Sequence, residues 1–304
     1  MTPSAPSLGL GIDAGGTQTR WALASADGAI VAEGVAAGMS ALEAPDALRA
    51  KLAPLAASVR AHGTVAQIHA GLTGFGGDAA PLQAVFAALF DLPAARIHVR
   101  SDIEIAYLDS FVPGAGYLIY AGTGSIGAYI DADGRFQRAG GRGVVLDDGG
   151  GGFWIAREAL RHVWRNEDEE PGRWRGCALA RAVFAHIGSE DWTASRQFLY
   201  GQERGAVGTL ALAVAACADT SPVARDILQR AGAELARLAS ALTQRYGVRP
   251  LALGGRAATL HPSIEASMRA ALPPDAVLTR ASGHAHHGAA RAAATPPSTA
   301  PCSR

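Results

Sequence analysis

The stretch that most constrains this chain begins at Gly11 and reads Gly-Ile-Asp-Ala-Gly-Gly-Thr-Gln-Thr. Gly15 and Gly16 predict a tight turn between two short strands, because glycine adopts backbone conformations that other residues avoid. Such a turn lets backbone N–H groups approach an anion closely, and the hydroxyls of Thr17 and Thr19 can donate further hydrogen bonds to phosphoryl oxygens. The residue types therefore indicate a phosphate-binding turn.

Asp13 lies two residues before this glycine pair. Its carboxylate suits a magnesium ion, or the waters around one, and makes it the candidate metal ligand. For an isolated motif of this length, an ordinary glycine hairpin with a turn aspartate is the alternative. The rest of the sequence favours the phosphate site, because a second copy of the pattern follows.

The pattern returns in the middle of the chain. Residues 117–120 predict a strand, 121–125 a glycine- and hydroxyl-rich turn, and 126–130 the returning strand. In both copies an Asp-Gly pair then turns the chain toward a third strand. Two such copies predict a duplicated α/β fold with both glycine turns on one nucleotide cleft. The second turn contributes the candidate nucleotide-binding residues Gly122, Thr123 and Gly124.

Chain length and composition support two domains. With 304 residues, of which 49% are hydrophobic, each half can bury its own core. The formal net charge is zero and the pI is about 7.1, which disfavours nucleic acid and membrane as partners and favours a small-molecule ligand. The three cysteines form no disulfide or metal pattern, and neither a membrane-spanning run nor a signal-peptide pattern occurs. We therefore expect a cytoplasmic protein.

Asp102 is the candidate catalytic group. It follows a predicted strand over 96–100 and precedes a predicted helix over 103–111. In open α/β sheets, ligand sites lie at the carboxyl ends of strands. The helix dipole favours the charged carboxylate, so Asp102 can act as a proton acceptor. The alternative is that Ser101 or Asp102 only caps the helix.

Two more glycine-rich segments predict ligand contacts. Four glycines, Gly149–Gly152, lead into a predicted amphipathic helix over 153–164, which indicates a ligand loop at a helix N-terminus. Within this segment Asp148 could accept hydrogen bonds from a polyhydroxylated substrate, and Arg142 could orient it. A flexible surface loop is the alternative. Later, Gly254-Gly255 ends a short strand and would let a flat base lie against the backbone, although it could also be a packing turn.

The expected domains are residues 8–112 and 113–282, and a helix near 283–292 is a candidate to pack back on the first domain. The tails, 1–7 and 293–304, are rich in Pro, Ser, Thr and Ala and are expected to be disordered. Further predicted elements are helices over 41–61, 81–90 and 262–271, a helix capped by Ser221 with Pro222 as its first residue, and a strand over 66–71.

In this order, the segments resemble those of the sugar kinase, heat-shock protein and actin superfamily, and within it the N-acetylglucosamine kinase and BadF/BadG/BcrA/BcrD ATPase-like group. The resemblance covers about residues 8–292. It rests on the two glycine turns, Ser101-Asp102, the segment from Gly140-Gly141-Arg142 to Asp148, and Gly254-Gly255. It implies two actin-like (ribonuclease H-like) α/β domains flanking an ATP cleft, and an ATP-dependent phosphotransferase.

The resemblance also implies roles by position. Thr17 and Thr123 would contact nucleotide phosphates, Gly254-Gly255 would lie by the adenosine, and Asp102 would be the base. The residues implied for sugar binding are Asp102, Ser125, Gly141, Arg142 and Asp148. The Gly-Gly-Arg at 140–142 resembles bacterial glucosamine kinases more than animal N-acetylglucosamine kinases.

Two departures from the family pattern leave the sugar open. The loop after the third strand usually holds an asparagine but here reads Ala36-Ala37-Gly38-Met39-Ser40, and the usual Asp-Glu-Gly-Ser or Asp-Gln-Gly-Ser becomes Asp148-Gly149-Gly150-Gly151. We expect an ATP- and Mg²⁺-dependent kinase that phosphorylates a primary hydroxyl of glucosamine or N-acetylglucosamine. The sequence leaves the oligomeric state open, a homodimer included.

Two other functions stay open. BadF-type activators couple ATP hydrolysis to a partner enzyme and hold an iron–sulfur cluster through cysteines in glycine-rich loops, whereas Cys177 and Cys217 lie in alanine-rich segments expected to be helical. A non-catalytic sugar or nucleotide sensor is the second alternative, which Asp102 counts against. The repressor-related sugar kinases usually carry a zinc-binding cysteine cluster, and this sequence has none.

Overall fold

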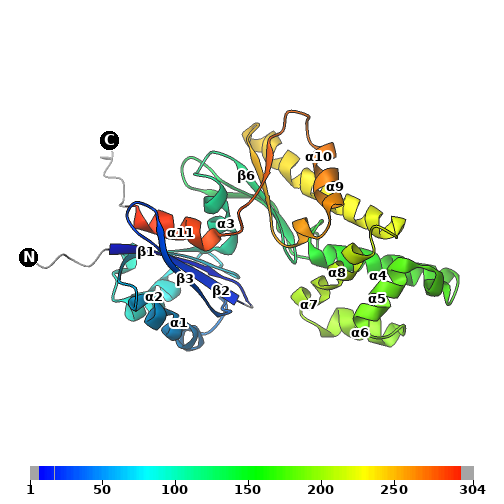
Figure 1. Ribbon diagram of the computed structural model, residues 1–304, viewed down its shortest axis with the longest axis horizontal. Coiled ribbons are helices and arrows are strands. Elements are labelled where there is room, and N and C mark those ends of the chain that lie inside the picture. The colour runs from blue at the N-terminus through cyan, green and yellow to red at the C-terminus, as the bar shows by residue number, and fades with distance from the viewer. Residues whose placement is uncertain (1–6, 17, 296–304) are drawn as a thin grey trace, which may run out of the picture. The chain divides into compact units, whose positions relative to one another are not determined.

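The computed structural model describes residues 7–16 and 18–295. The described chain divides into two compact units. Unit 1 holds the residues up to Val112 together with those from Ser282 onward, and unit 2 is Pro113–Ala281. In Figure 1, unit 1 therefore combines the blue and cyan part of the ribbon with the red helix near the C-terminus.

Unit 1 is built on a five-stranded sheet in the order β3-β2-β1-β4-β5. The first three strands are antiparallel neighbours, and β4 and β5 continue the sheet in parallel. The bounds are β1 (Ser7–Ala14), β2 (Gln18–Ala24), β3 (Ile30–Ala37), β4 (Thr64–Leu72) and β5 (Ile97–Ser101). The carboxyl ends of β1, β4 and β5 thus lie along one edge, where ligands bind in sheets of this kind.

Helices cover both faces of this sheet (Figure 1). Leu8, Leu10 and Ile12 alternate along β1 and belong to the main core, together with apolar residues of α1 (Pro45–Arg60) and α2 (Ala80–Phe90). Against the other face pack α3 (Asp102–Ser110) and α11 (Ala285–Ala294). A short 3-10 helix, η1 (Ala94–Arg96), leads into β5.

Glycines let α11 lie directly on β1. A Cβ on Gly11 would come within 2.1 Å of the carbonyl oxygen of His286, and one on Gly9 within 2.1 Å of the nitrogen of Ala294. The alternation of leucine and glycine in β1 therefore provides one side-chain face for the core and one bare face for a helix. The small residues of α11 complete this contact.

Unit 2 repeats the strand order of unit 1. Its sheet runs β10-β9-β6-β7-β8, with β6 to β8 antiparallel and β9 and β10 parallel. The bounds are β6 (Tyr117–Ala121), β7 (Ser125–Ile130), β8 (Phe136–Gly140), β9 (Leu251–Gly254) and β10 (Leu278–Arg280). The equivalence of β1–β5 with β6–β10 confirms the predicted duplicated α/β fold.

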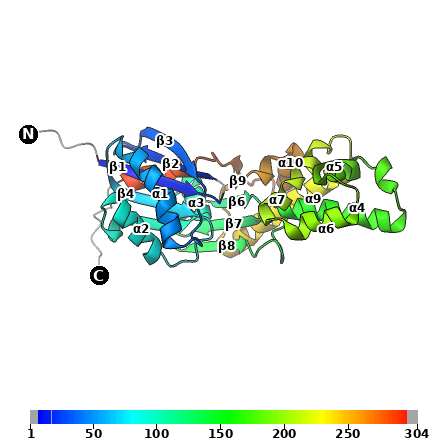
Figure 2. The ribbon, with the colours of Figure 1, turned by 90° about the horizontal axis from the view of Figure 1, so that it is seen from below.

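The main difference is the connection from the third to the fourth strand, which is one helix in unit 1 and a helical layer in unit 2. Figure 2 shows this layer, in which α9 packs against α4 and α10. The helices are α4 (Gly152–Glu169), α5 (Ala178–Ile187), α6 (Trp192–Gly201), α7 (Arg204–Gly208), α8 (Leu210–Ala216), α9 (Pro222–Tyr246) and, after β9, α10 (Pro262–Ala271), with 3-10 helices η2 (Arg173–Gly176) and η3 (Ala257–Thr259).

Some predicted boundaries were wrong. The first helix starts at Pro45 and not near 41, because proline suits the first helical turn and the residues before it form a loop. The helix after the glycine run extends to Glu169, five residues beyond the predicted end. Ser7 and Ala293, expected in disordered tails, are ordered in β1 and α11. Ala294 also belongs to α11, and Thr295 follows it; residues 1–6 and 296–304 lie outside the described residues.

No helix within residues 7–16 and 18–295 is both long and apolar enough to cross a membrane.

Candidate nucleotide and sugar site

The first glycine turn joins β1 to β2 as predicted, but not all its groups are free for a ligand. The N–H of Gly15 donates to the carbonyl of Gln18 at 3.0 Å and closes the turn. Thr19 is fully buried, so the expectation that its hydroxyl faces a phosphate is wrong. Gly16 is exposed, and no described atom lies within 4 Å of where its Cβ would be. Thr17 lies outside the described residues.

Asp13 and Asp102 are neighbours at the carboxyl ends of β1 and β5. Burial, together with the charge of Asp102, raises the pKa of Asp13 from 3.8 to about 6, and the charge of Arg20 partly opposes this. Burial also raises the pKa of Asp102. Two partly buried carboxylates that disfavour each other's charge form a site that a divalent cation would stabilise. The strand order of unit 1 brings them together across the intervening β4.

The helix at Asp102 resolves the capping alternative. Ser101 is the N-cap of α3: its hydroxyl accepts the N–H of Glu104, and the Glu104 carboxylate accepts the N–H of Ser101 at 3.0 Å. This capping box makes Ser101 the N-cap of the helix. The carboxylate of Asp102, the first residue of α3, accepts the N–H of Ile103 at 2.9 Å. This bond satisfies one further N–H of the first helical turn and holds the carboxylate at the strand end.

Thr73, which was not predicted from the sequence, is a further candidate residue beside Asp102. It follows β4 directly, and its side chain hydrogen-bonds to Asp102, which lowers the pKa of that carboxyl against the effect of burial. Its N–H donates to the carbonyl of Ala14 at 2.9 Å, and its carbonyl accepts the hydroxyl of Ser40 at 3.1 Å. A hydroxyl residue at the end of a buried strand, just before Gly74, was the available signal.

The second glycine turn, in unit 2, is also closed by a backbone hydrogen bond of its first glycine. The N–H of Gly122 donates to the carbonyl of Gly124 at 2.9 Å, while Thr123 is exposed. The glycine run of the sugar segment packs onto this turn: Gly152 donates to the carbonyl of Gly122 at 2.8 Å, and a Cβ on Gly151 would lie 2.6 Å from Gly124. The run is therefore needed for close backbone approach.

Asp148 lies inside this assembly. It is 8% exposed, and its carboxylate accepts the N–H of Gly143 at 3.0 Å. Burial raises its pKa. The space beside Gly124 is filled by this carboxylate, whose Oδ2 would be 2.1 Å from an added Cβ. The neighbouring Asp147 pairs with Arg237 at 3.0 Å.

The other predicted sugar residues surround this loop. The hydroxyl of Ser125 is buried and donates to the carbonyl of Gly149 at 2.6 Å, and its carbonyl accepts the N–H of Gly141 at 3.1 Å. Arg142 is exposed. The hydroxyl of Ser125 is therefore occupied by a bond within the fold. A ligand could contact only the backbone beside it.

Gly254-Gly255 ends β9 beside the second turn. Gly255 has a φ of +92°, and a Cβ there would meet the carbonyl oxygen of Ala121 at 2.3 Å. The pair is therefore required for the contact between β9 and β6, as in the packing-turn alternative. A nucleotide base could lie only against the face of this backbone that Ala121 does not cover.

The model of the BadF/BadG/BcrA/BcrD ATPase family matches residues 10–267, a range that includes every glycine-rich motif described above and Asp102. The chain belongs to this family. The predicted family is therefore confirmed. No curated protein matches the sequence.

Solved structures share the fold of this BadF/BadG/BcrA/BcrD family member. A protein of Chromobacterium violaceum named a "putative N-acetylglucosamine kinase" has a TM-score of 0.72 and 24% identity over 95% of this chain and 99% of its own. One of the same name from Porphyromonas gingivalis has a TM-score of 0.71 and 18% identity, over 92% and 96%. A ROK family glucokinase of Streptomyces griseus, in complex with glucose and AMPPNP, has a TM-score of 0.58 and 19% identity over 94% of this chain and 98% of its own. These likenesses confirm the two-sheet α/β fold.

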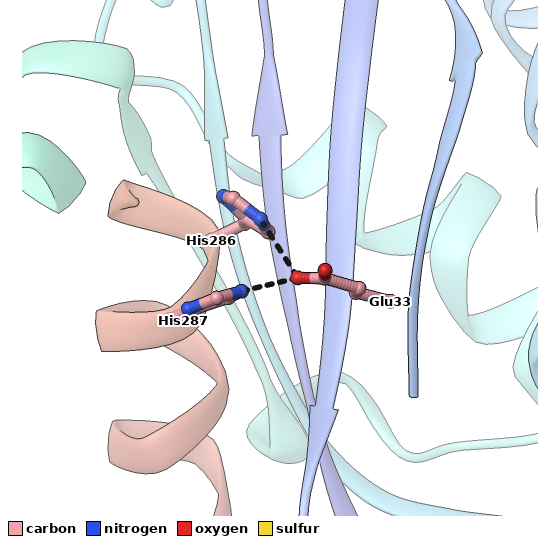
Figure 3. A group of neighbouring side chains, drawn as sticks. All are labelled: Glu33, His286 and His287. Carbon is pink, nitrogen blue, oxygen red and sulfur yellow. Dashed lines mark hydrogen bonds and ion pairs between the residues drawn. The ribbon is translucent and has the colours of Figure 1, made fainter. Parts of the chain in front are cut away.

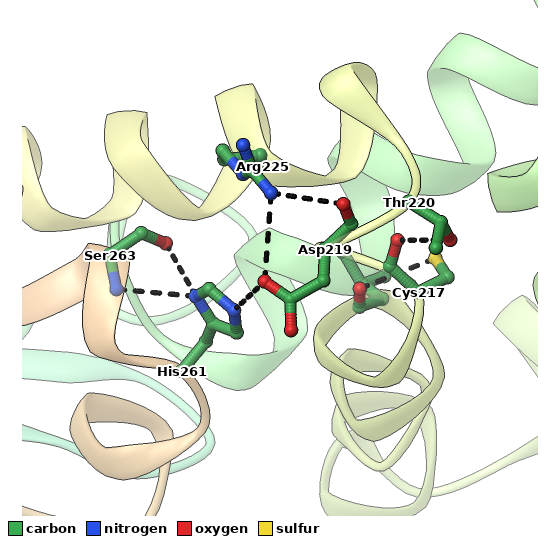
Figure 4. Close-up of polar contacts among 7 residues, drawn as sticks. Cys217, Asp219, Thr220, Arg225, His261 and Ser263 are labelled. Carbon is green, nitrogen blue, oxygen red and sulfur yellow. Dashed lines mark hydrogen bonds and ion pairs between the residues drawn. The ribbon is translucent and has the colours of Figure 1, made fainter.

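Within this family, the cluster-holding alternative depends on cysteines near the nucleotide. Cys177 precedes α5 and Cys217 ends α8, and both are free thiols outside the glycine turns. The Cys217 thiol donates to the carbonyl of Val214 at 3.4 Å, and the carbonyl of Cys217 accepts the hydroxyl of Thr220 (Figure 4). Their positions at helix ends give no support to a cluster.

Figure 4 also contains an Asp-His-Ser set that has a capping role. His261 lies 3.4 Å from Asp219, and its Nδ1 is 2.8 Å from the hydroxyl of Ser263. The same Nδ1 accepts the backbone N–H of Ser263 at 3.2 Å and caps α10. Its acceptor capacity is satisfied by this backbone N–H, so the set is not a nucleophilic site.

Proposed function

We propose that the protein is an ATP-dependent sugar kinase that phosphorylates a primary hydroxyl of an amino sugar. The observation that carries the proposal is Asp102, a partly buried carboxylate at a strand end that is hydrogen-bonded by Thr73 and is not the N-cap of the helix that follows. A proton acceptor is what a hydroxyl needs as it attacks phosphorus. Membership of an ATPase family supports ATP as the donor.

Nucleotide binding would use exposed groups of the glycine turns. Gly16 in unit 1 and Thr123 in unit 2 are both exposed and lie at turns closed by their own hydrogen bonds. A preformed turn presents its free N–H groups to phosphate without reorganisation. The fit of Asp13 to a cation supports Mg²⁺ as cofactor; when bound, it would supply positive charge to the nucleotide phosphates.

The proposed reaction is an in-line displacement. The sugar oxygen forms a bond to the γ-phosphorus, the bond from that phosphorus to the bridging oxygen of ADP breaks, and the hydroxyl proton passes to Asp102. Thr73 holds the Asp102 carboxylate in place through its side chain. Catalysis rests on positioning and electrostatics more than on a strong base.

The proposed choice among amino sugars rests on Asp147 and Asp148 and on the segment 140–142. An acidic pair of Asp147 and Asp148 would favour the ammonium group of glucosamine, although Asp147 also pairs with Arg237, which it shares with Glu234. The Gly-Gly-Arg at 140–142 keeps glucosamine first among the candidates. Ser40, in the loop without the usual asparagine, has a hydroxyl already bonded to Thr73.

The test is ADP release from ATP and Mg²⁺ with a panel of sugars: glucosamine, N-acetylglucosamine, glucose and a no-sugar control. Phosphorylated product is identified by mass spectrometry. We expect ADP and sugar phosphate in equal amounts, with glucosamine preferred. ADP release without sugar would favour the ATPase alternative, and nucleotide binding without any turnover would favour a sensor; either result contradicts the proposal.

A further inference from the structure

A histidine-rich cluster lies in unit 1, at the start of α11 and on the edge strand β3. His286 and His287 project from α11 toward Glu33 of β3, as Figure 3 shows. The ring of His284 stacks on that of His287 with centroids 5.0 Å apart. None of these residues has a role in the nucleotide and sugar site.

Three ligand atoms of this cluster converge. The Nε2 atoms of His287 and His286 lie 2.5 Å and 3.8 Å from the same carboxylate oxygen of Glu33, and one ligand atom from each residue falls within a mutual distance of 4.8 Å. In a tetrahedral zinc site, bonds of about 2.0–2.1 Å separate neighbouring ligand atoms by about 3.3 Å. Small movements of the three side chains would bring their ligand atoms to this spacing.

The cluster combines a rigid part and an adjustable part. His286 is only 5% exposed, and its backbone is fixed against Gly11 of β1. Its Nδ1 has no hydrogen-bond partner among the described residues, so Nε2 is the ring nitrogen that meets a polar group. The Glu33 side chain is 59% exposed and can move outward by the small distance an ion needs. Solvent reaches the site from this edge of the sheet.

The donor set defines the class of ion. Two imidazole nitrogens and one carboxylate oxygen are typical of zinc and similar transition ions, whereas Mg²⁺ and Ca²⁺ prefer oxygen ligands only. The negative charge of Glu33 attracts a cation to the two histidines. The positive charge of Arg20, which acts on His286, opposes this attraction. Three protein ligands leave one position for water.

We propose that Glu33, His286 and His287 form a binding site for a divalent transition ion of the zinc class. The ion would join the edge strand β3 to α11, two segments at opposite ends of the sequence. It is a site separate from the Mg²⁺ proposed at Asp13, and it does not depend on the kinase function.

The test uses the full chain, stripped with a chelator and titrated with Zn²⁺ by calorimetry, with Co²⁺ absorption as a report of coordination by nitrogen and oxygen. We expect one ion per chain. Glu33→Gln and His287→Gln should each weaken Zn²⁺ binding about tenfold or more, as loss of a ligand or its close partner does. Glu33 is exposed and His287 is only partly buried, so neither change should prevent folding.

His62→Gln is the matched control, because His62 is an exposed histidine of the same unit outside the cluster. It should leave the affinity unchanged. Zn²⁺ should also raise the melting temperature of the wild type more than that of Glu33→Gln, since binding to the folded state stabilises it in proportion to the logarithm of affinity. Absence of one-to-one binding, or equal affinity in the wild type and both cluster variants, would overturn the proposal.

Discussion

Asp102 follows the capping Ser101, and the side chain of Thr73 hydrogen-bonds to its carboxylate. We predict that Asp102→Asn reduces sugar-dependent turnover by at least about a hundredfold, because the amide cannot accept the proton. ATP affinity, measured by calorimetry, should change little. Asp78→Asn is the control, an exposed carboxylate of the same unit at a helix start. Retention of most activity in Asp102→Asn would refute the base assignment.

Asp148 allows a test of sugar binding that keeps the fold. Its φ is +54°, a conformation that asparagine tolerates and that other side chains rarely adopt. Asp148→Asn should therefore preserve the loop while removing the negative charge, and should raise the apparent KM for an amino sugar several-fold with ATP affinity little changed. Steady-state kinetics with glucosamine and N-acetylglucosamine decide it. An unchanged KM for both would exclude Asp148 from the sugar site.

At the scale of elements, α11 can pack on β1 because Gly9 and Gly11 have no side chains. Gly11→Ala should destabilise the protein by about 1–3 kcal/mol or more, because the new methyl meets helix backbone that cannot move aside alone. Gly16→Ala, where the space is open, should stay within about 0.5 kcal/mol. Denaturant unfolding of both variants gives the comparison. Equal stabilities would mean that α11 can shift without cost.

The link between α10 and β10 predicts a pH dependence. Glu265 pairs with Arg269 at 2.8 Å and with Arg280 at 2.7 Å, and these hydrogen bonds lower its pKa below the usual 4.5. A lowered folded-state pKa contributes stability above pH 4.5 that is lost as pH falls through the folded value. Glu265→Gln should thus be less stable than wild type at pH 7, by up to about 1 kcal/mol. The difference should vanish in acid, and a difference independent of pH would contradict this origin.

For the whole molecule, unit 1 needs both ends of the chain. A chain ending at Ala281 lacks α11, which covers one face of the unit 1 sheet, so we expect unit 1 to lose its protection from proteases while unit 2 keeps it. A chain ending at Thr295 retains the helix and is the control. Limited proteolysis followed by mass spectrometry measures the rate of cleavage in each unit separately. Equal protection of residues 7–112 in the two chains would show that α11 is dispensable.

The sequence alone determined the duplicated fold and its two turns, since these depend on local chemistry. Glycine pairs permit tight turns, alternating apolar residues form strands, and Ser221 with Pro222 starts a helix wherever they occur. The same reasoning placed Asp102 at a strand end, and it identified the family that the match over 10–267 confirms.

Only the tertiary structure decided which groups are free and which residues meet. Thr19 is buried, the N–H of Gly15 closes its own turn, and Asp147 pairs with Arg237, a partner distant in sequence. The meeting of Glu33 with His286 and His287 likewise joins segments from opposite ends of the chain. Sequence periodicity reports which face of an element is apolar, but the partner on that face is set by packing of the whole unit.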